Sequence, residues 1–298
     1  NDIKLQTARL YHDKNNDPLA LKLYTEIMND PDCTFDLKFS AAAEAANIHI
    51  TEKRYDLASE KIKYITSNAL DPDQKSEGEL LMAQIYFIKK DYQKAASEFE
   101  RAAALDVPGI REKALYWLMR SHIEMNDLEK AFDDSNRIMS EFKDSKTAIE
   151  ASYYQGDILS RLGKNKEAEE QFAKTAHDYP KSEFAELSLF QAGKTAFDNS
   201  DFPKASSYFT ELVKIYPDSK LAPNSLYKKL CCEYASGNEN AALKTARALI
   251  NKYSSSEFAP ASLFWLIDYY REKGSFDKAA SIASETMEKY KDDPSVSA

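Results

Sequence analysis

The sequence predicts an all-α chain in which about eight helical hairpins stack into an α-α superhelix, or solenoid. Three observations predict this fold. A short motif recurs about every 37 residues along all 298 residues, a period typical of solenoids. Apolar residues make up 43% of the chain, enough for a buried core. Only 7 glycines and 10 prolines are present, fewer turn residues than an all-β sandwich or barrel of this length uses.

Each repeat is anchored on an alanine, which in the clearest copies follows an aromatic residue by three positions. These copies are Tyr55 to Ala58, Tyr92 to Ala95, Phe202 to Ala205 and Phe276 to Ala279. The eight anchors are Ala20, Ala58, Ala95, Ala131, Ala168, Ala205, Ala242 and Ala279, spaced by 36 to 38 residues. The spacing predicts one solenoid domain over residues 1–298, with about eight repeats of 37 residues.

Residues just before the anchors predict a tight turn between the two helices of a repeat. Four positions before the anchor lie Asn16, Asp91, Asp127, Asp201, Asn238 and Ser275, residue types that cap helix N-termini. One position earlier lie Asn15, Asn126, Gly163, Gly237 and Gly274, which suit a left-handed residue at the end of the preceding helix.

A second break is predicted about eleven residues after the anchor. Here the tags Tyr179 to Ser182, Tyr216 to Ser219 and Tyr253 to Ser256 contain proline or serine. We expect each tag to end one helix and its last serine to cap the next.

Residue size alternates between the two helices of most repeats. Twelve positions before the anchor the residue is small, at Ala8, Ala46, Ala83, Gly156 and Gly193. Four positions after the anchor it is bulky, at Tyr24, Ile62, Phe99, Phe172 and Phe209. Both rules fail in three repeats, which have Met119, Leu230 and Ile267 at the first position and Ser135, Ala246 and Ala283 at the second.

These motifs resemble those of the tetratricopeptide-repeat (TPR) family over essentially the whole chain. The family repeat has an early small residue, the anchor alanine, a following aromatic residue and a terminal proline. The resemblance implies a superhelix whose first helices line a concave groove that binds other proteins. The Tyr-Pro-x-Ser-x-x-Ala tag is similar to repeats of bacterial envelope proteins, namely the outer-membrane-assembly lipoprotein and the TolA-partner cell-division factor. This finer resemblance implies the bacterial periplasm or outer membrane, although cytoplasmic repeat proteins carry the tag too.

Residues at 15, 11 and 8 positions before the anchors share one face of the first helices. The middle row is polar almost throughout, so this face is expected to meet water. The predicted partner-binding groove comprises Tyr116, Arg120, Tyr153, Asp157, Phe190, Lys194, Phe197, Tyr227 and Tyr234. Two alternatives stay open: the aromatic residues can instead pack between adjacent first helices, and Arg120 and Lys194 can be solvated charges.

Catalysis has little support in the sequence. No metal-binding, phosphate-loop or nucleophile-elbow motif occurs, so we expect no enzyme activity, cofactor or metal. His49 and His122 are predicted to be packing residues and Cys232 a small core residue, whereas Cys231 belongs to the polar row. Two carboxylate pairs, Glu169-Glu170 and Asp292-Asp293, are expected to be solvated.

Charge and hydropathy narrow the choice of partner. The net charge is −9, which disfavours nucleic acid, and no segment is apolar enough for membrane insertion. The partner is therefore expected to be a protein or peptide, bound by a non-enzymatic scaffold. Alternatively, the array is a regulatory or spacer repeat region of a larger multidomain enzyme or envelope machine. Both ends fall in phase with the repeat, so we expect a longer chain or self-association through uncapped ends.

Overall fold

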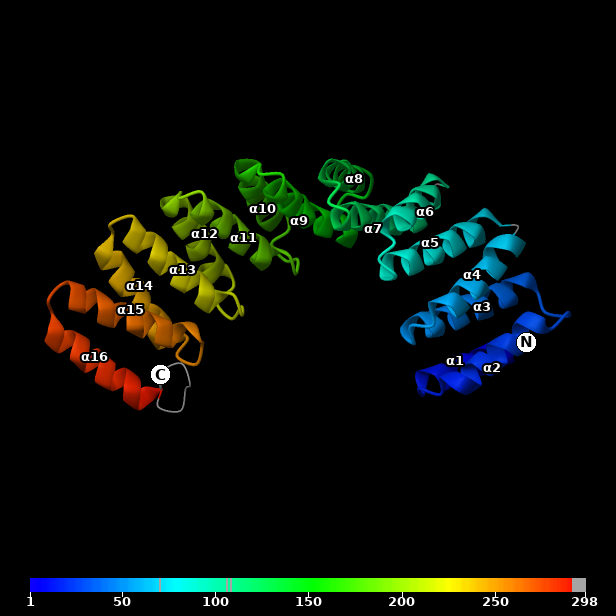
Figure 1. The fold of residues 1–298 in the computed structure, drawn as a ribbon, viewed down its shortest axis with the longest axis horizontal. Helices are drawn as coiled ribbons and strands as arrows, with labels where there is room; N and C mark the ends of the chain where they lie inside the picture. The colour runs from blue at the N-terminus through cyan, green and yellow to red at the C-terminus, as the bar shows by residue number, and fades with distance from the viewer. Residues whose placement is uncertain (70, 106, 108, 291–298) are drawn as a thin grey trace. The chain divides into compact units, whose positions relative to one another are not determined.

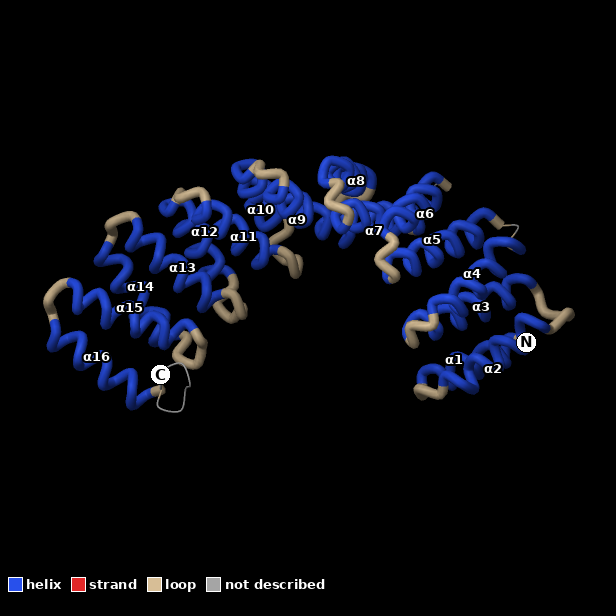
Figure 2. The backbone as a smooth tube through the Cα atoms, in the orientation of Figure 1, coloured by secondary structure: helices blue, strands red, loops and turns tan. Residues whose placement is uncertain are grey.

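The computed structural model describes residues 1–69, 71–105, 107 and 109–290, and over these residues the protein contains helices and connecting turns but no strand (Figures 1 and 2). This confirms the predicted all-α class. The helices are α1 (Asp2–Asp13), α2 (Asp17–Asn29), α3 (Phe35–Thr51), α4 (Tyr55–Asn68), α5 (Pro72–Ile88), α6 (Tyr92–Ala104), α7 (Ile110–Glu124), α8 (Leu128–Glu141), α9 (Lys146–Arg161), α10 (Asn165–Asp178), α11 (Ala185–Asp198), α12 (Phe202–Ile215), α13 (Ala222–Ala235), α14 (Glu239–Lys252), α15 (Phe258–Glu272) and α16 (Phe276–Lys289).

The chain divides within α9 into two compact units, unit 1 (Asn1–Ala151) and unit 2 (Ser152–Ala298). In unit 1 each helix from α1 to α7 packs on the next, and α1, α3, α5 and α7 also contact one another in order. In unit 2 consecutive helices from α10 to α16 pack in the same way, and α13 contacts α15. Odd-numbered helices are therefore the first helices of the hairpins. That all eight repeats form one domain stays a prediction.

The turn inside each hairpin follows the predicted chemistry. All six predicted capping residues occupy N-cap positions, and the residues before them have positive φ angles, from 57° at Asn15 to 75° at Gly237. Only Asp91 and Asp201 accept a side-chain hydrogen bond from the helix, at 3.4 Å from the Lys94 amide and 3.2 Å from the Lys204 amide. The left-handed backbone conformation is therefore common to all six of these turns, whereas a side-chain capping hydrogen bond occurs in only two.

Replacing Lys90 with glycine is expected to raise the free energy of unfolding by about 0.5–1 kcal/mol. Lys90 has a φ of 62°, where the Cβ of an L-residue meets the following carbonyl at a cost of about 1–2 kcal/mol. The greater entropy of unfolded glycine offsets part of the gain. Urea unfolding followed by circular dichroism measures the change. Lys89→Gly is the control, since Lys89 has a φ of −72° and glycine there should destabilise; a loss with both variants would contradict the prediction.

The predicted serine caps after the second break are wrong. The first helices α11, α13 and α15 are preceded by Phe184, Leu221 and Glu257 at their N-caps, not by serine. The serine carbonyls serve the turn in all three tags, since those of Ser182, Ser219 and Ser256 accept hydrogen bonds from the amides of Ala185, Ala222 and Ala259. The Ser219 hydroxyl also accepts from the Leu221 amide at 3.0 Å. One extra turn therefore separates each tag from the next helix.

Tyrosine in the tag ties one repeat to the previous one. The Tyr216 hydroxyl donates to the carbonyl of Pro180, and the Tyr253 hydroxyl donates to that of Pro217, both at 2.7 Å. These bonds join residues 36 positions apart, so the Tyr-Pro pair has a structural role between adjacent hairpins.

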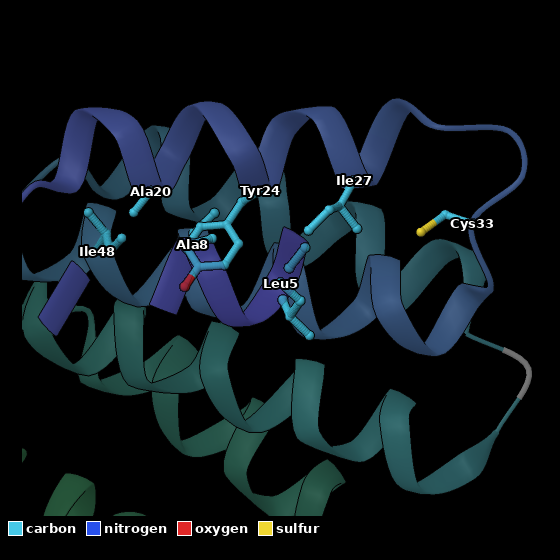
Figure 3. Close-up of a cluster of buried hydrophobic side chains, with 9 residues drawn as sticks. Leu5, Ala8, Ala20, Tyr24, Ile27, Cys33 and Ile48 are labelled. Carbon is cyan, nitrogen blue, oxygen red and sulfur yellow. The ribbon is translucent and has the colours of Figure 1, made fainter. Parts of the chain in front are cut away.

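The core of each hairpin lies where the anchor alanine meets the first helix, and all eight anchors are buried. In unit 1, Ala8, Ala20 and Tyr24 pack together with Leu5 and Ile27 (Figure 3). In unit 2, two first helices carry glycine at the position of Ala8. A Cβ added at Gly156 would lie 2.6 Å from the ring of Phe172, and one added at Gly193 would lie 2.7 Å from the ring of Phe209.

The repeats that break the size rule reverse it. Met119 and Leu230 are fully buried on the first helix, and Ser135 and Ala246, at the position for the bulky residue, are fully buried on the second. A large residue from either helix thus fills the space beside a small one from the other. Because cores tolerate substitution when total volume is kept, both arrangements pack.

Replacing Tyr24 with phenylalanine is expected to raise the free energy of unfolding by about 1 kcal/mol and to weaken its decline at alkaline pH. The hydroxyl is buried and has no hydrogen-bond partner among the described residues. Burial raises the pKa of Tyr24 to about 12. The unfolded state therefore ionises first, so stability present below pH 10 is lost as pH rises toward 12.

Urea unfolding of wild type and variant at neutral pH and at about pH 11 measures both effects. Tyr253→Phe is the matched control, because that hydroxyl donates to the carbonyl of Pro217 and its loss should cost about 1 kcal/mol. Equal destabilisation by the two substitutions would contradict the prediction for Tyr24.

Candidate functional site

The predicted groove residues divide between the two units. Tyr116 and Arg120 lie on α7 in unit 1, where they form a network with α9. The Tyr116 hydroxyl donates to Glu150 Oε1 at 2.5 Å, and Arg120 Nη1 donates to the Tyr116 hydroxyl at 3.0 Å. Burial raises the pKa of Tyr116 above its ordinary value. In this unit the two predicted residues therefore contact each other.

In unit 2 the predicted aromatic row is half-buried, and its rings pack against neighbouring rings. The ring centroid of Tyr153 lies 5.6 Å from that of Phe172 and 5.4 Å from that of Phe184. Phe190 lies 5.9 Å from Phe209, and the ring of Tyr227 contacts that of Phe258 at 5.8 Å. Each row member therefore helps to pack its hairpin and still keeps an exposed part, so packing and ligand contact are compatible.

Two of the predicted polar residues, Asp157 on α9 and Lys194 on α11, line one cleft of about 310 Å³. The other lining residues are Ser160, Asn165, Phe172, Gln191, Thr195 and Asp198. Within the described part of the chain, the Lys194 ammonium has no carboxylate within 4.0 Å, and neither Asp157 nor Asp198 has a cation within that distance. The cleft therefore presents charges of both signs, together with amide and hydroxyl groups that can donate and accept hydrogen bonds.

Aromatic residues lie further along the first helices of unit 2. Phe197 contacts Phe202 at 5.4 Å, and the Lys228 ammonium lies 5.3 Å from the Phe197 ring centroid. Tyr234 is 38% exposed; its ring meets Trp265 edge-on at 5.4 Å. Sequence reasoning missed Trp265, which lies 14 positions before its anchor, as Lys228 and Trp117 do.

The histidines and cysteines considered as possible catalytic groups are largely buried in the packing of the hairpins. His49 and His122 are buried, as predicted, and so is Cys232. Burial raises the pKa of Cys232 to about 12 and that of Cys231 above its ordinary value, which disfavours the reactive thiolate. Nowhere in the described residues do three or more His, Cys, Asp or Glu side chains gather as a metal site would need.

The prediction that Glu169 is solvated is wrong. Its side chain is buried, and its carboxylate accepts from the Tyr208 hydroxyl at 3.0 Å and contacts the Lys204 ammonium at 2.5 Å. Two partners from α12 compensate the buried charge. Glu170 is exposed, whereas Asp292-Asp293 lies outside the described residues.

Among the residues that the structure describes, no helix combines the length and apolar character that a membrane span requires.

Comparisons with known proteins agree with this architecture. A family model described as tetratricopeptide repeat matches residues 113–145, 150–182 and 187–219. A search of curated proteins found no sequence match. Among solved structures, the apo form of RapI is similar with a TM-score of 0.62 and 14% identity, covering 98% of both chains.

Two further structures are tetratricopeptide-repeat proteins by description. One is a tetratricopeptide repeat protein from Parabacteroides merdae ATCC 43184, with a TM-score of 0.51 and 16% identity over 84% of this chain and 92% of that one. The other is a signal transduction ATPase with numerous domains from Pyrococcus horikoshii that carries a tetratricopeptide repeat sensor. It has a TM-score of 0.58 and 17% identity, and covers 97% of this chain, which spans 46% of the ATPase. Three segments of the chain therefore match the tetratricopeptide-repeat model, and its fold is similar to that of solved tetratricopeptide-repeat structures.

Proposed function

We propose that the chain is a non-enzymatic scaffold that binds an extended segment of a protein partner on the first-helix face of unit 2. The observation that carries this proposal is the cleft lined by Asp157 and Lys194. Its charges have no ion-pair partners among the described residues, and its amides and hydroxyls match the alternating donors and acceptors of a peptide main chain. Stacked hairpins of this kind usually bind proteins on such a face.

Exposed aromatic rings on α13 and α15, the first helices that follow the cleft along the chain, supply the apolar part of the interaction. Phe264 is 40% exposed and Tyr234 is 38% exposed, and aromatic residues are enriched among those that dominate binding energy. Tyr153, Phe190 and Tyr227 add half-buried rings to the same face. We infer that the partner segment places apolar side chains on these rings and its main chain over the cleft.

Replacing Lys194 with glutamate is expected to weaken peptide binding by about tenfold or more, the usual effect of reversing a charge at a polar contact. Peptides selected from a random display library on the wild-type protein provide the probe, and fluorescence polarisation measures their affinity. Lys174→Glu is the matched control, because Lys174 is exposed on α10 outside the cleft. Circular dichroism checks the helicity of every variant.

A triple variant, with Tyr153, Phe190 and Tyr227 changed to alanine, tests the aromatic row. A selected peptide that bound the triple variant and Lys194→Glu as tightly as the wild type would move the site off this face. Failure of the library to yield any binder would contradict the scaffold proposal itself.

A second function is a repeat region that senses or spaces within a longer protein, as the tetratricopeptide repeats of the Pyrococcus horikoshii ATPase are a sensor in that protein. A bacterial envelope location for this chain, suggested by the Tyr-Pro-x-Ser-x-x-Ala tag, also stays a proposal. Fractionation of the native organism with an antibody against unit 2 tests both, since it reports compartment and full-length mass together.

A further inference from the structure

A second cavity in unit 2 lies away from the cleft, among α14, α15 and α16, the last three helices in Figure 1. Its volume is about 300 Å³, and it is lined by Arg247, Tyr270, Lys278, Ser281 and Ile282. Four of these five side chains carry hydrogen-bond donors, and two of them are cations.

The two cations converge on one tyrosine. Arg247 Nη2 donates to the Tyr270 hydroxyl at 3.1 Å, and the Lys278 ammonium lies 5.4 Å from the Tyr270 ring centroid. Tyr270 is buried, so its hydroxyl offers the guanidinium of Arg247 a fixed hydrogen-bond acceptor in the cavity lining. Because its hydroxyl accepts from Arg247, the hydroxyl hydrogen remains for another acceptor.

No carboxylate neutralises this pair. Among the described residues, neither Arg247 nor Lys278 has an acidic partner within 4.0 Å. The other three cavities described in this structure all include acidic residues in their linings: Glu211 in one, Asp157 and Asp198 in the cleft, and Glu79 and Glu98 in the third. The cavity at Arg247 is therefore the one of the four whose lining charges are all positive.

Packing of the repeat does not explain Arg247. Five positions after the anchor, the other repeats carry Thr25, Lys63, Glu100, Asn136, Ala173, Thr210 and Ser284. This position accepts neutral, acidic and basic side chains, so the fold does not require a guanidinium there. Arg247 and its bond to Tyr270 are features of this one site.

We propose that the cavity among α14, α15 and α16 binds the phosphate group of a phosphate monoester. Such a group carries a charge of about −1.5 to −2 at neutral pH and three strong acceptor oxygens. A guanidinium, an ammonium and the hydroxyls of Tyr270 and Ser281 supply matching charge and donors. The phosphate can come from a small phosphate ester or from a phosphoserine side chain of a partner, and both present the same chemistry.

Isothermal titration calorimetry of the full chain at constant ionic strength tests the proposal. The probes are inorganic phosphate, phosphoserine, a short peptide with one phosphoserine flanked by glycine and serine, and acetate. We expect saturable binding of the phosphate probes, weakened about tenfold or more by Arg247→Gln and by Lys278→Gln. Lys252→Gln is the matched control, since Lys252 lies on α14 over the Tyr253 ring and outside the cavity.

The probes separate the two sources. Tighter binding of the phosphopeptide than of phosphoserine assigns the site to a modified partner, and equal binding assigns it to a small phosphate ester. Absence of saturable binding, equal weakening by Lys252→Gln, or acetate binding as tight as phosphate would overturn the proposal. The site is independent of the cleft, so Lys194→Glu should leave phosphate binding unchanged even where it abolishes peptide binding.

Discussion

Replacing Phe209 with alanine is expected to lower the free energy of unfolding by about 3–5 kcal/mol, the usual cost of emptying a fully buried aromatic site. Phe209 on α12 is fully buried and packs with Ala196, Ala205 and Cys232. Its ring also fills the space left by the missing side chain of Gly193. The backbones of α11 and α12 are therefore already close, and collapse around the lost ring is limited.

Hydrogen exchange of the α11 and α12 amides measures this loss locally, because repeat arrays need not unfold as one cooperative unit. Phe276→Ala is the control: Phe276 is 67% exposed and its loss should change stability by less than about 0.5 kcal/mol. Similar effects of the two substitutions would contradict the assignment of Phe209 to the core.

The pair Gly193 and Phe209 also tests whether a small first-helix residue with a bulky second-helix residue is equivalent to the reverse arrangement. In one hairpin of unit 2, Leu230 on the first helix faces Ala246 on the second, and both are fully buried. A double variant with Gly193→Leu and Phe209→Ala copies that arrangement. We expect it to recover at least about half of the stability lost in Phe209→Ala alone, because total core volume is kept. A double variant less stable than Phe209→Ala would show that the close backbone approach at Gly193 is fixed.

The hairpins could be predicted from the sequence because the residues that repeat about every 37 positions each have a single structural role. An anchor alanine must fit between helices, and the residue ending a first helix must adopt a positive φ. Both requirements recur every repeat and can be counted. The predicted serine caps were wrong because the contact shared by Ser182, Ser219 and Ser256 is made by their carbonyls, and any residue has a carbonyl.

The candidate site was less predictable because it depends on which side chains meet between repeats. Asp157 and Lys194 could be placed on one face, but Gln191 and Asn165 joined the cleft only once adjacent helices were in place. Glu169 looked solvated beside Glu170, since its compensating partners Lys204 and Tyr208 lie in the next repeat. Partners 35 to 39 residues away leave no local pattern.

Replacing His122 with leucine is expected to cost about 3–5 kcal/mol, because it would leave the buried Asp134 carboxylate without its closest partner. His122 Nδ1 and Asp134 Oδ2 lie 2.6 Å apart, joining α7 to α8. Both side chains are buried. Arg137 is 3.5 Å from the same carboxylate, but it is exposed by about a third and compensates only part of the charge.

Replacing both residues with leucine is expected to restore most of the lost stability, since an apolar pair of similar volume often matches a buried ion pair. The chain already contains an uncharged pair at the equivalent positions, Tyr270 and Ile282, whose side chains pack in one core cluster. A double-mutant cycle from urea unfolding gives the coupling between His122 and Asp134.

The pH dependence of the His122→Leu variant provides an independent test of the same pair. Burial raises the pKa of Asp134, whereas His122 and Arg137 lower it. Without His122 the folded carboxyl should hold its proton further above the ordinary value of 3.8. The unfolded state then loses its proton first, so the variant should lose stability as pH rises from about 4 toward neutral. A variant whose deficit stays constant over that range, together with a double variant as unstable as His122→Leu, would mean that packing and not the buried charge accounts for the loss.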